Sequence, residues 1–163
     1  MAHKFKINKE SLKREYAVYV VIARSDSDIK LYVGKTGDNR EGCNPIISRC
    51  GNHFSYNKIH SQVRNKISNH ENREYTFIFE HFGKYDEKNK AALTALTNEM
   101  ERWLKIEIQA LIDKYENCKI VNSYKGTGYI NKKERERRES LRTPEHKTKI
   151  QRIVKTVKSE IGG

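Results

Sequence analysis

Four side chains that phosphodiester chemistry uses lie within a short span of the chain. Tyr32 and Lys35 stand on either side of Gly34 at the end of an apolar run, and Arg49 and His53 follow four residues apart. Hydrolysis of a phosphodiester needs an activated water and groups that stabilise the charge on the phosphoryl and leaving oxygens. A tyrosine can act as the base if a nearby cation favours its phenolate form, and arginine is a forked donor that fits phosphate. These residue types therefore indicate chemistry on a phosphodiester.

Two further positions could complete such a site. Tyr19 lies in an earlier apolar run, and Glu107 interrupts the apolar helical pattern of residues 104–112. A carboxylate inside an apolar run needs a reason, and one carboxylate can hold Mg²⁺ against a phosphate. We therefore favour Glu107 as a metal ligand, with Glu99 and Glu101 as alternatives for the same role.

Each of these residues also has a plain structural explanation. Tyr19 and Tyr32 could pack a sheet as strand aromatics. Lys35 and Arg49 could be solvated surface cations, and His53 could be a buried histidine with a satisfied hydrogen bond. It is the order of the whole set along the chain, rather than any one member, that favours a site.

Strand-like and helical patterns alternate around these residues. Runs rich in β-branched and aromatic residues predict three strands, at residues 16–23, 29–34 and 75–82, and residues 118–122 form a short extended piece. Apolar spacings of three and four predict helices at residues 45–52, 57–68 and 90–115, followed by two in the charged tail. In the second of these helices, Ile59, Val63 and Ile67 form the apolar stripe. The expected fold is α+β, with a small, mainly antiparallel three-stranded sheet flanked by helices.

The composition is strongly basic. The formal net charge is +12 over 163 residues, and from Lys125 onward 12 lysines and arginines stand against 5 glutamates. Such a field attracts polyanions, nucleic acid first and an anionic membrane second, although the basic segments carry few of the bulky apolar anchors that membrane binding needs. No apolar stretch approaches the roughly 20 residues that span a bilayer, and the polar N-terminus predicts no signal peptide. A cytoplasmic location is expected.

The tyrosine motifs resemble those of the GIY-YIG nuclease family over about residues 16–123. Ala17-Val18-Tyr19 corresponds to the first motif of the family, with alanine where glycine is usual, and Tyr32-Val33-Gly34 corresponds to the second. Arg49 and His53 match the helix arginine of the family and the histidine or tyrosine one turn later.

Two later residues extend the resemblance. Glu107 matches the acidic metal ligand of the family, and Asn122 matches its closing asparagine. The resemblance implies hydrolysis of double-stranded DNA with one Mg²⁺ or Mn²⁺ ion per active site, held by Glu107. Gly34 and Asn122 would support the site, and no small-molecule cofactor or membrane partner is implied.

The resemblance also implies a role for each catalytic residue. A tyrosine, either Tyr19 or Tyr32, would activate the water with the help of Lys35 or His53. Arg49 would hold the scissile phosphate. Members of the family differ in which tyrosine is the base, so this point stays open.

A small chain with these motifs resembles the type II restriction endonucleases of the family, which belong to restriction–modification systems. Such enzymes often act as homodimers, because two strands must be cut. One alternative is a mobile-element or repair nuclease of the same family. Another is a nucleic-acid-binding module that keeps the fold without the catalysis.

The chain is expected to consist of a basic N-terminal arm (1–15), a nuclease domain (16–123) and a basic helical extension (124–163). Polar and basic side chains outside the motifs are expected to bind DNA, because Asn, Gln, Arg and Lys read base edges and cations bind phosphate. These residues are Arg40, Asn57, Lys58, His60, Gln62, Arg64, Lys125, Lys132, Lys133 and Arg135.

Overall fold

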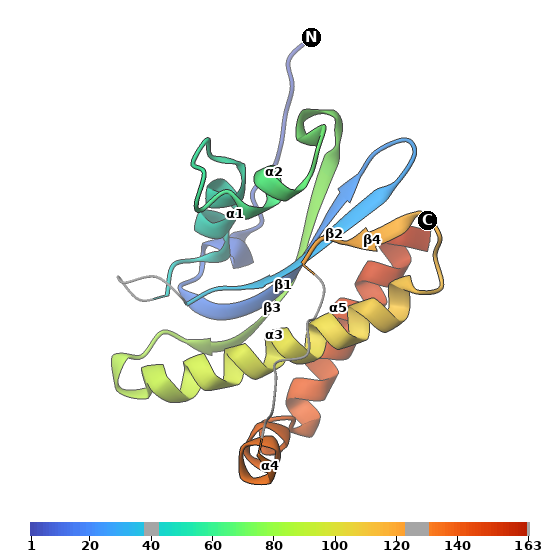
Figure 1. The fold of residues 1–163 in the computed structure, drawn as a ribbon. Helices are drawn as coiled ribbons and strands as arrows, with labels where there is room; N and C mark the ends of the chain where they lie inside the picture. The colour runs from blue at the N-terminus through green and yellow to red at the C-terminus, as the bar shows by residue number, and fades with distance from the viewer. Residues whose placement is uncertain (38–42, 123–130, 163) are drawn as a thin grey trace.

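A four-stranded mixed sheet forms the centre of the molecule in a computed structural model, which describes residues 1–37, 43–122 and 131–162 (Figure 1). In sheet order, its strands are β3 (Glu74–Lys84), β1 (Glu15–Arg24), β2 (Ile29–Lys35) and β4 (Cys118–Ile120). β1 pairs antiparallel with both β2 and β3, whereas β4 lies parallel to β2. The α+β class is confirmed. The prediction of three strands was wrong, because the extended piece that contains Cys118 joins the sheet as a fourth strand.

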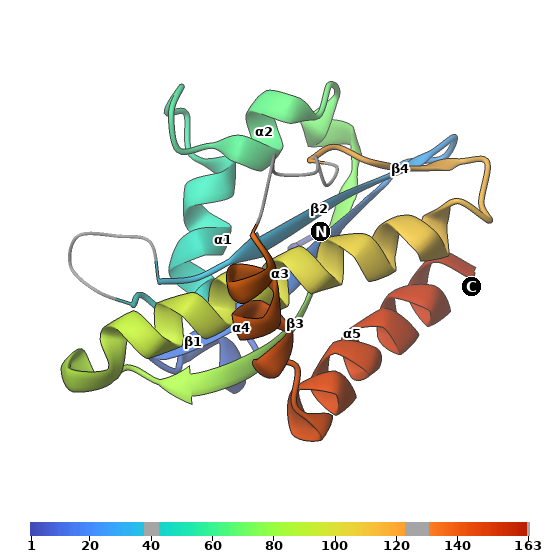
Figure 2. The same ribbon diagram turned by 60° about the horizontal axis from the view of Figure 1, so that its bottom comes forward.

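Helices cover both faces of the sheet. They are α1 (Ile46–Phe54), α2 (Gln62–Lys66), α3 (Lys90–Ile112), α4 (Lys132–Ser140) and α5 (Pro144–Gly162), with short 3-10 helices at η1 (Lys9–Leu12), η2 (His70–Asn72) and η3 (Glu87–Asn89). α1 and α2 lie on one face, and α3 and α5 lie side by side on the other (Figures 1 and 2). Among the helices of the described ranges, none has the length and apolar character needed to span a bilayer.

Strand β1 separates two cores, because alternate side chains of a strand point to opposite faces of a sheet. Val18, Val20 and Ile22 pack with α3 and α5 in an aliphatic core. Tyr19, Val21 and Ala23 pack with α1 and α2 in a smaller core that is richer in aromatic rings. The residues from Tyr16 to Ala23 are all at most 2% exposed, as expected of a central strand covered on both sides.

Helix α5 belongs to the aliphatic core, although the charge of the tail had suggested a separate extension. Its apolar stripe is buried and consists of Ile150, Ile153, Val157 and Ile161. A buried ion-pair network also fixes this end of the chain to α3. Glu99 is 2% exposed and accepts hydrogen bonds from Arg102 and Arg142, the latter at 3.0 Å from Nη2. The charged tail is therefore partly a structural element.

The second predicted helix is confined to the short α2. The side-chain Oδ1 of Asn57 accepts the backbone N–H groups of Ile59 at 2.8 Å and His60 at 3.1 Å, which offers the backbone an alternative to a helical turn. Val63 and Ile67 are buried as expected. Ile59 is 72% exposed, so the prediction that it belongs to the apolar stripe was wrong.

Candidate active site

Tyr19 and Gly34 face each other across the ladder between β1 and β2. The phenol ring of Tyr19 lies over Gly34, so that a Cβ atom at position 34 would be 2.5 Å from its Cζ and Oη atoms. Any side chain there would push the ring away. The supporting role predicted for Gly34 therefore has a geometric reason: the missing side chain makes room for the Tyr19 hydroxyl.

His53 on α1 meets Tyr19 on β1. Its Nε2 lies 2.6 Å from the Tyr19 Oη, both side chains are buried, and its ring centroid is 5.0 Å from that of Tyr32. Burial, followed by the charges of Arg49 and Lys66, lowers the pKa of His53 to about 4. The imidazole is therefore neutral at pH 7 and carries one ring proton. Either Tyr19 donates to Nε2 or Nε2–H donates to Tyr19, and Nδ1 has no hydrogen-bond partner among the described groups.

Arg49 supplies the cation beside Tyr19. Burial raises the pKa of Tyr19 above its ordinary value of about 10, and Arg49 opposes this shift through its charge and a hydrogen bond. The neighbouring Tyr32 and Glu101 raise the pKa of Tyr19 further. Tyr19 is thus a neutral phenol at pH 7. The three residues that act on this pKa, Tyr32, Arg49 and Glu101, come from β2, α1 and α3, and they are brought together only by folding.

The structure separates Glu107 from this group. Glu107 is exposed, lines a groove between α3 and α5, and accepts a hydrogen bond from Trp103 Nε1 at 3.2 Å. Glu101, six residues earlier on α3, forms an ion pair with Lys105 at 3.4 Å and acts on the pKa of Tyr19. Glu107 is therefore not among the groups that act on Tyr19, whereas Glu101, the alternative for the same metal role, is. The role of either carboxylate as a metal ligand stays a prediction.

Lys35 and Asn122 lie beside β2, near the site. The Nζ of Lys35 donates a hydrogen bond to the Oδ1 of Asn98 on α3, one helical turn before Glu101. The Oδ1 of Asn122 accepts the backbone N–H of Val33 at 2.9 Å, and its Nδ2 donates to the Val33 carbonyl. Asn122 thereby continues the pairing of β4 with β2. Asn98 was not predicted, and the only sequence signal for it is its spacing of three residues from Glu101.

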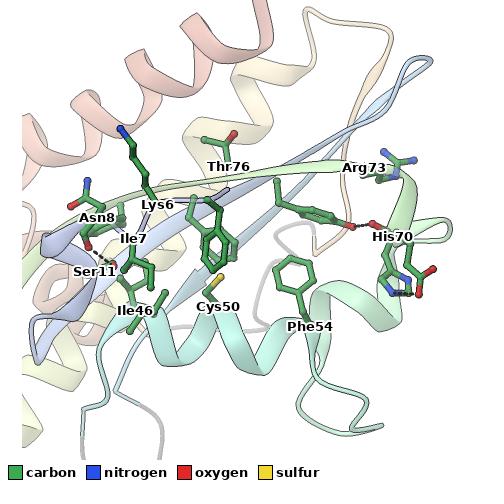
Figure 3. A pocket seen from close by; sticks show the side chains of 16 residues that line it. Lys6, Ile7, Asn8, Ser11, Ile46, Cys50, Phe54, His70, Arg73 and Thr76 are labelled. Atoms are coloured by element: carbon green, nitrogen blue, oxygen red, sulfur yellow. Dashed lines mark hydrogen bonds and ion pairs between the residues drawn. The ribbon is translucent and has the colours of Figure 1, made fainter. Parts of the chain in front are cut away.

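Helix α1 also lines a cavity. The cavity has a volume of about 710 Å³ and lies between α1, β3 and the N-terminal arm. Figure 3 shows Ile46, Cys50 and Phe54 of α1 on its wall, together with Ile7 of the arm. Neither Arg49 nor His53 lines this cavity, but Phe77, which does, lies between the cavity and the candidate site, with its ring centroid 5.8 Å from that of Tyr19 and 6.3 Å from that of His53.

The predicted DNA-binding residues after α1 fall into two groups. Lys58 and His60 are exposed. The side chains of Asn57, Gln62 and Arg64 hydrogen-bond backbone groups of the same segment. The sequence could not distinguish these groups, because both consist of polar or basic residues that suit contacts with DNA.

Of the remaining predicted DNA-binding residues, the structure describes three. Lys132, Lys133 and Arg135 are exposed on α4. Arg40 and Lys125 lie outside the described residues. No DNA contact of these residues follows from the structure, and their role stays a prediction.

The residues present fit a single Mg²⁺ or Mn²⁺ ion. Within the described ranges, no group of three or more His, Cys, Asp and Glu residues is placed to hold a metal. Mg²⁺ needs no such cage, because it keeps several waters and is usually bound by one or two carboxylates together with substrate phosphates. Glu101, whose charge acts on the pKa of Tyr19, is the carboxylate that could take part in such a site.

Comparisons with protein-family models, curated proteins and solved structures found no match for this chain. The fold and the meeting of Tyr19, Arg49, His53 and Glu101 are therefore the basis for an argument about function. The resemblance of the sequence motifs to the GIY-YIG family adds an expectation about the reaction, which is hydrolysis of a phosphodiester.

Proposed function

We propose that the chain is a metal-dependent DNA endonuclease of the GIY-YIG type, and more specifically a sequence-specific type II restriction enzyme. The observation that carries this proposal is the buried contact of Tyr19 with His53 and Arg49, beside the carboxylate of Glu101. The strongly basic composition supports a polyanionic substrate. Double-stranded DNA is the proposed partner, and the enzyme would act as a homodimer to cut both strands.

Arg49 would bind the scissile phosphate. Its guanidinium can present two parallel N–H donors to two phosphate oxygens, which fixes the phosphorus relative to the tyrosines. Because Arg49 also favours the phenolate form of Tyr19, phosphate binding and water activation would be coupled at one residue.

A tyrosine would accept the proton of the attacking water. Tyr19 is fully buried and has the neutral imidazole of His53 at 2.6 Å, whereas Tyr32 is 8% exposed. His53 would orient the Tyr19 hydroxyl and take the phenolic proton at Nε2, so that the Tyr19 oxygen can accept the proton of the water. Lys35, held by Asn98 on α3, would add positive charge at the end of β2.

Glu101 would hold the divalent metal. When bound there, the ion supplies positive charge to the phosphoryl oxygens in the transition state. The lowered pKa of His53 suits this arrangement, because a neutral imidazole adds no repulsive charge near the ion.

The test is incubation of the purified chain with plasmid DNA and Mg²⁺ or Mn²⁺. We expect discrete fragments from the parent protein. Arg49→Ala and Glu101→Gln should each slow cleavage about 100-fold or more, because each removes a group that stabilises transition-state charge. Glu107→Gln is the matched control on the same helix, and it should cut at the parent rate.

Three outcomes would contradict parts of this proposal. A parent protein that binds DNA but cuts no plasmid with either metal would be a binding module, not an enzyme. Nicking restricted to damaged or branched DNA would replace the restriction role with a repair role. Normal cleavage by Glu101→Gln together with loss in Glu107→Gln would return the metal to Glu107.

A further inference from the structure

The loop between α1 and α2, residues 55–61, presents two large apolar side chains to solvent. Tyr56 is 78% exposed and Ile59 is 72% exposed. An exposed isoleucine on a surface loop has no packing role in the chain itself. Because Ile59 lies between Lys58 and His60, which are also exposed, the loop carries an apolar tip with polar neighbours on both sides.

The loop is nevertheless firmly built. Ser61 is fully buried, and its hydroxyl lies 2.8 Å from that of Ser55. The Nε of Arg64 donates to the Ser55 carbonyl at 2.8 Å, and the Nδ2 of Asn65 donates to the Lys58 carbonyl at 2.8 Å. Several of the polar side chains that suit base recognition are therefore used to hold the backbone. The exposed tip is a fixed feature rather than the result of a loose chain.

Tyr56 is fixed from two sides, which leaves Ile59 as the projecting residue. The Tyr56 hydroxyl donates to Glu71 Oε1 at 3.0 Å, and the guanidinium carbon of Arg64 lies 4.6 Å from the centroid of the tyrosine ring. The backbone carbonyl of Ile59 accepts a hydrogen bond from Gln62 Nε2 at 2.7 Å. The backbone of the tip is thus anchored while the Ile59 side chain extends into solvent.

The charged residues of this segment are all basic, and the carboxylate that contacts the loop, Glu71, is held by the Tyr56 hydroxyl. Residues 49–70 contain Arg49, Lys58, Arg64 and Lys66 and no aspartate or glutamate. The loop also begins only two residues after His53, so it is continuous with the helix that carries the candidate site. A cationic segment without carboxylates repels a second copy of itself and attracts a polyanion.

We propose that the tip of the loop, Lys58-Ile59-His60, is a wedge that enters a groove of DNA and inserts Ile59 against or between the bases. Apolar side chains such as isoleucine are used in this way by proteins that unstack and bend a duplex, while adjacent lysines bind phosphate. This inference rests on the proposed function. It adds a distortion of the duplex beside the site of cleavage.

The test compares Ile59→Ser and Lys58→Gln with the parent. Binding is measured by fluorescence anisotropy without divalent metal, over a range of salt concentrations. The probes are a short duplex that spans a cleavage site mapped on plasmid and a duplex of mixed sequence. Ile59→Ser should weaken binding about tenfold with an unchanged salt slope, because an apolar base contact releases no counterion. Lys58→Gln should lower the slope by about one.

A matched control variant and a second measurement test whether Ile59 unstacks the bases. Ile106→Ser alters another exposed isoleucine, on α3, and should bind like the parent. A 2-aminopurine base beside the mapped site should become more fluorescent on binding of the parent, because an unstacked base is less quenched. Ile59→Ser should lose at least half of that increase.

Several results would overturn the wedge. If the parent cuts plasmid and Ile59→Ser retains full affinity and the full fluorescence increase, the inference fails while the nuclease proposal stands. If Ile59→Ser changes the oligomeric state in sedimentation without affecting DNA binding, the tip is a protein contact. A parent that cuts no plasmid and does not bind the duplex of mixed sequence would overturn the wedge and the nuclease proposal together.

Discussion

The two faces of the sheet are packed by different kinds of side chain and covered by helices of different length. On the aliphatic face, the 23-residue α3 and the 19-residue α5 bury side chains such as Met100, Leu104 and Ile153 almost completely. On the aromatic face, the nine-residue α1 and the five-residue α2 cover Tyr19 and Tyr32. One strand, β1, supplies residues to both.

The buried polar groups follow the same division. His53 and Tyr19 have shifted pKa values and lie on the aromatic face, where the cover is thin and cationic. The aliphatic face holds the buried Glu99 network at its edge, where Arg102 and Arg142 satisfy the carboxylate. We infer that burial on the aliphatic face contributes most of the free energy of unfolding. On the aromatic face, the shorter helices bury fewer apolar side chains and hold the titratable groups Tyr19 and His53 in position.

The largest expected effect is the difference in stability between two variants, one with a substitution on each face. Leu104→Ala should lower the free energy of unfolding by about 2–5 kcal/mol, because it removes a fully buried side chain from the aliphatic core. Tyr19→Phe removes only one oxygen and its hydrogen bond to His53, and should cost about 1 kcal/mol. Urea denaturation measures both values.

In cleavage, the order of the two variants should reverse, so that Tyr19→Phe loses more activity than Leu104→Ala. Tyr19→Phe should slow single-turnover cleavage of plasmid about 100-fold, whereas Leu104→Ala, assayed below its unfolding temperature, should retain most of the parent rate. Tyr32→Phe in parallel identifies the base, since the larger loss belongs to the tyrosine that accepts the proton. If Tyr19→Phe slowed cleavage no more than Leu104→Ala does, the aromatic face would be an ordinary core.

The second effect is a dependence of stability on pH that arises from His53. Its pKa is about 4 in the folded protein and about 6.5 in the unfolded chain, so the unfolded state binds more protons between these values. The contribution is fully present above about pH 6.5 and is lost as the pH falls towards 4. The expected loss is up to about 3 kcal/mol.

His53→Gln should remove this part of the pH dependence, as measured by urea denaturation between about pH 7 and pH 4.5. His3→Gln alters an exposed histidine in the N-terminal arm and serves as the control, with a profile that should follow the parent. A profile for His53→Gln that also follows the parent would mean that the pKa of His53 is the same in the folded and unfolded states.

Much of the fold was accessible from the sequence because its signals are local. The hairpin of β1 and β2 and the strand β3 follow from runs of β-branched and aromatic residues, and α3 follows from its apolar period. β4 has three residues and no period of its own, and its pairing with β2 is a long-range contact. The short α2 results from Asn57, whose side chain competes for backbone N–H groups.

For the candidate site too, local signals were predictable from the sequence and long-range contacts were not. The spacing of Arg49 and His53 placed them on one face of a helix, as the structure has them. The choice between Glu101 and Glu107 depended on which side of α3 meets the site and which side meets α5. An apolar stripe fixes the buried side of a helix but not the partner on either flank, so the sequence did not show that Glu107 lines a groove with residues of α5.

The last prediction tests how closely the site is fitted to the sheet. In Gly34→Ala, the new Cβ atom would lie 2.5 Å from the Tyr19 ring, so the ring must move away from His53. We expect a loss of about 1–3 kcal/mol in urea denaturation and a cleavage rate close to that of Tyr19→Phe. Gly51→Ala is the control: it lies exposed in α1 with nothing within 4 Å of the added atom, and should stabilise the protein by about 0.5–1 kcal/mol. If Gly34→Ala cut DNA at the parent rate, the position of the Tyr19 hydroxyl would not matter for catalysis, and the aromatic face would lose its proposed role.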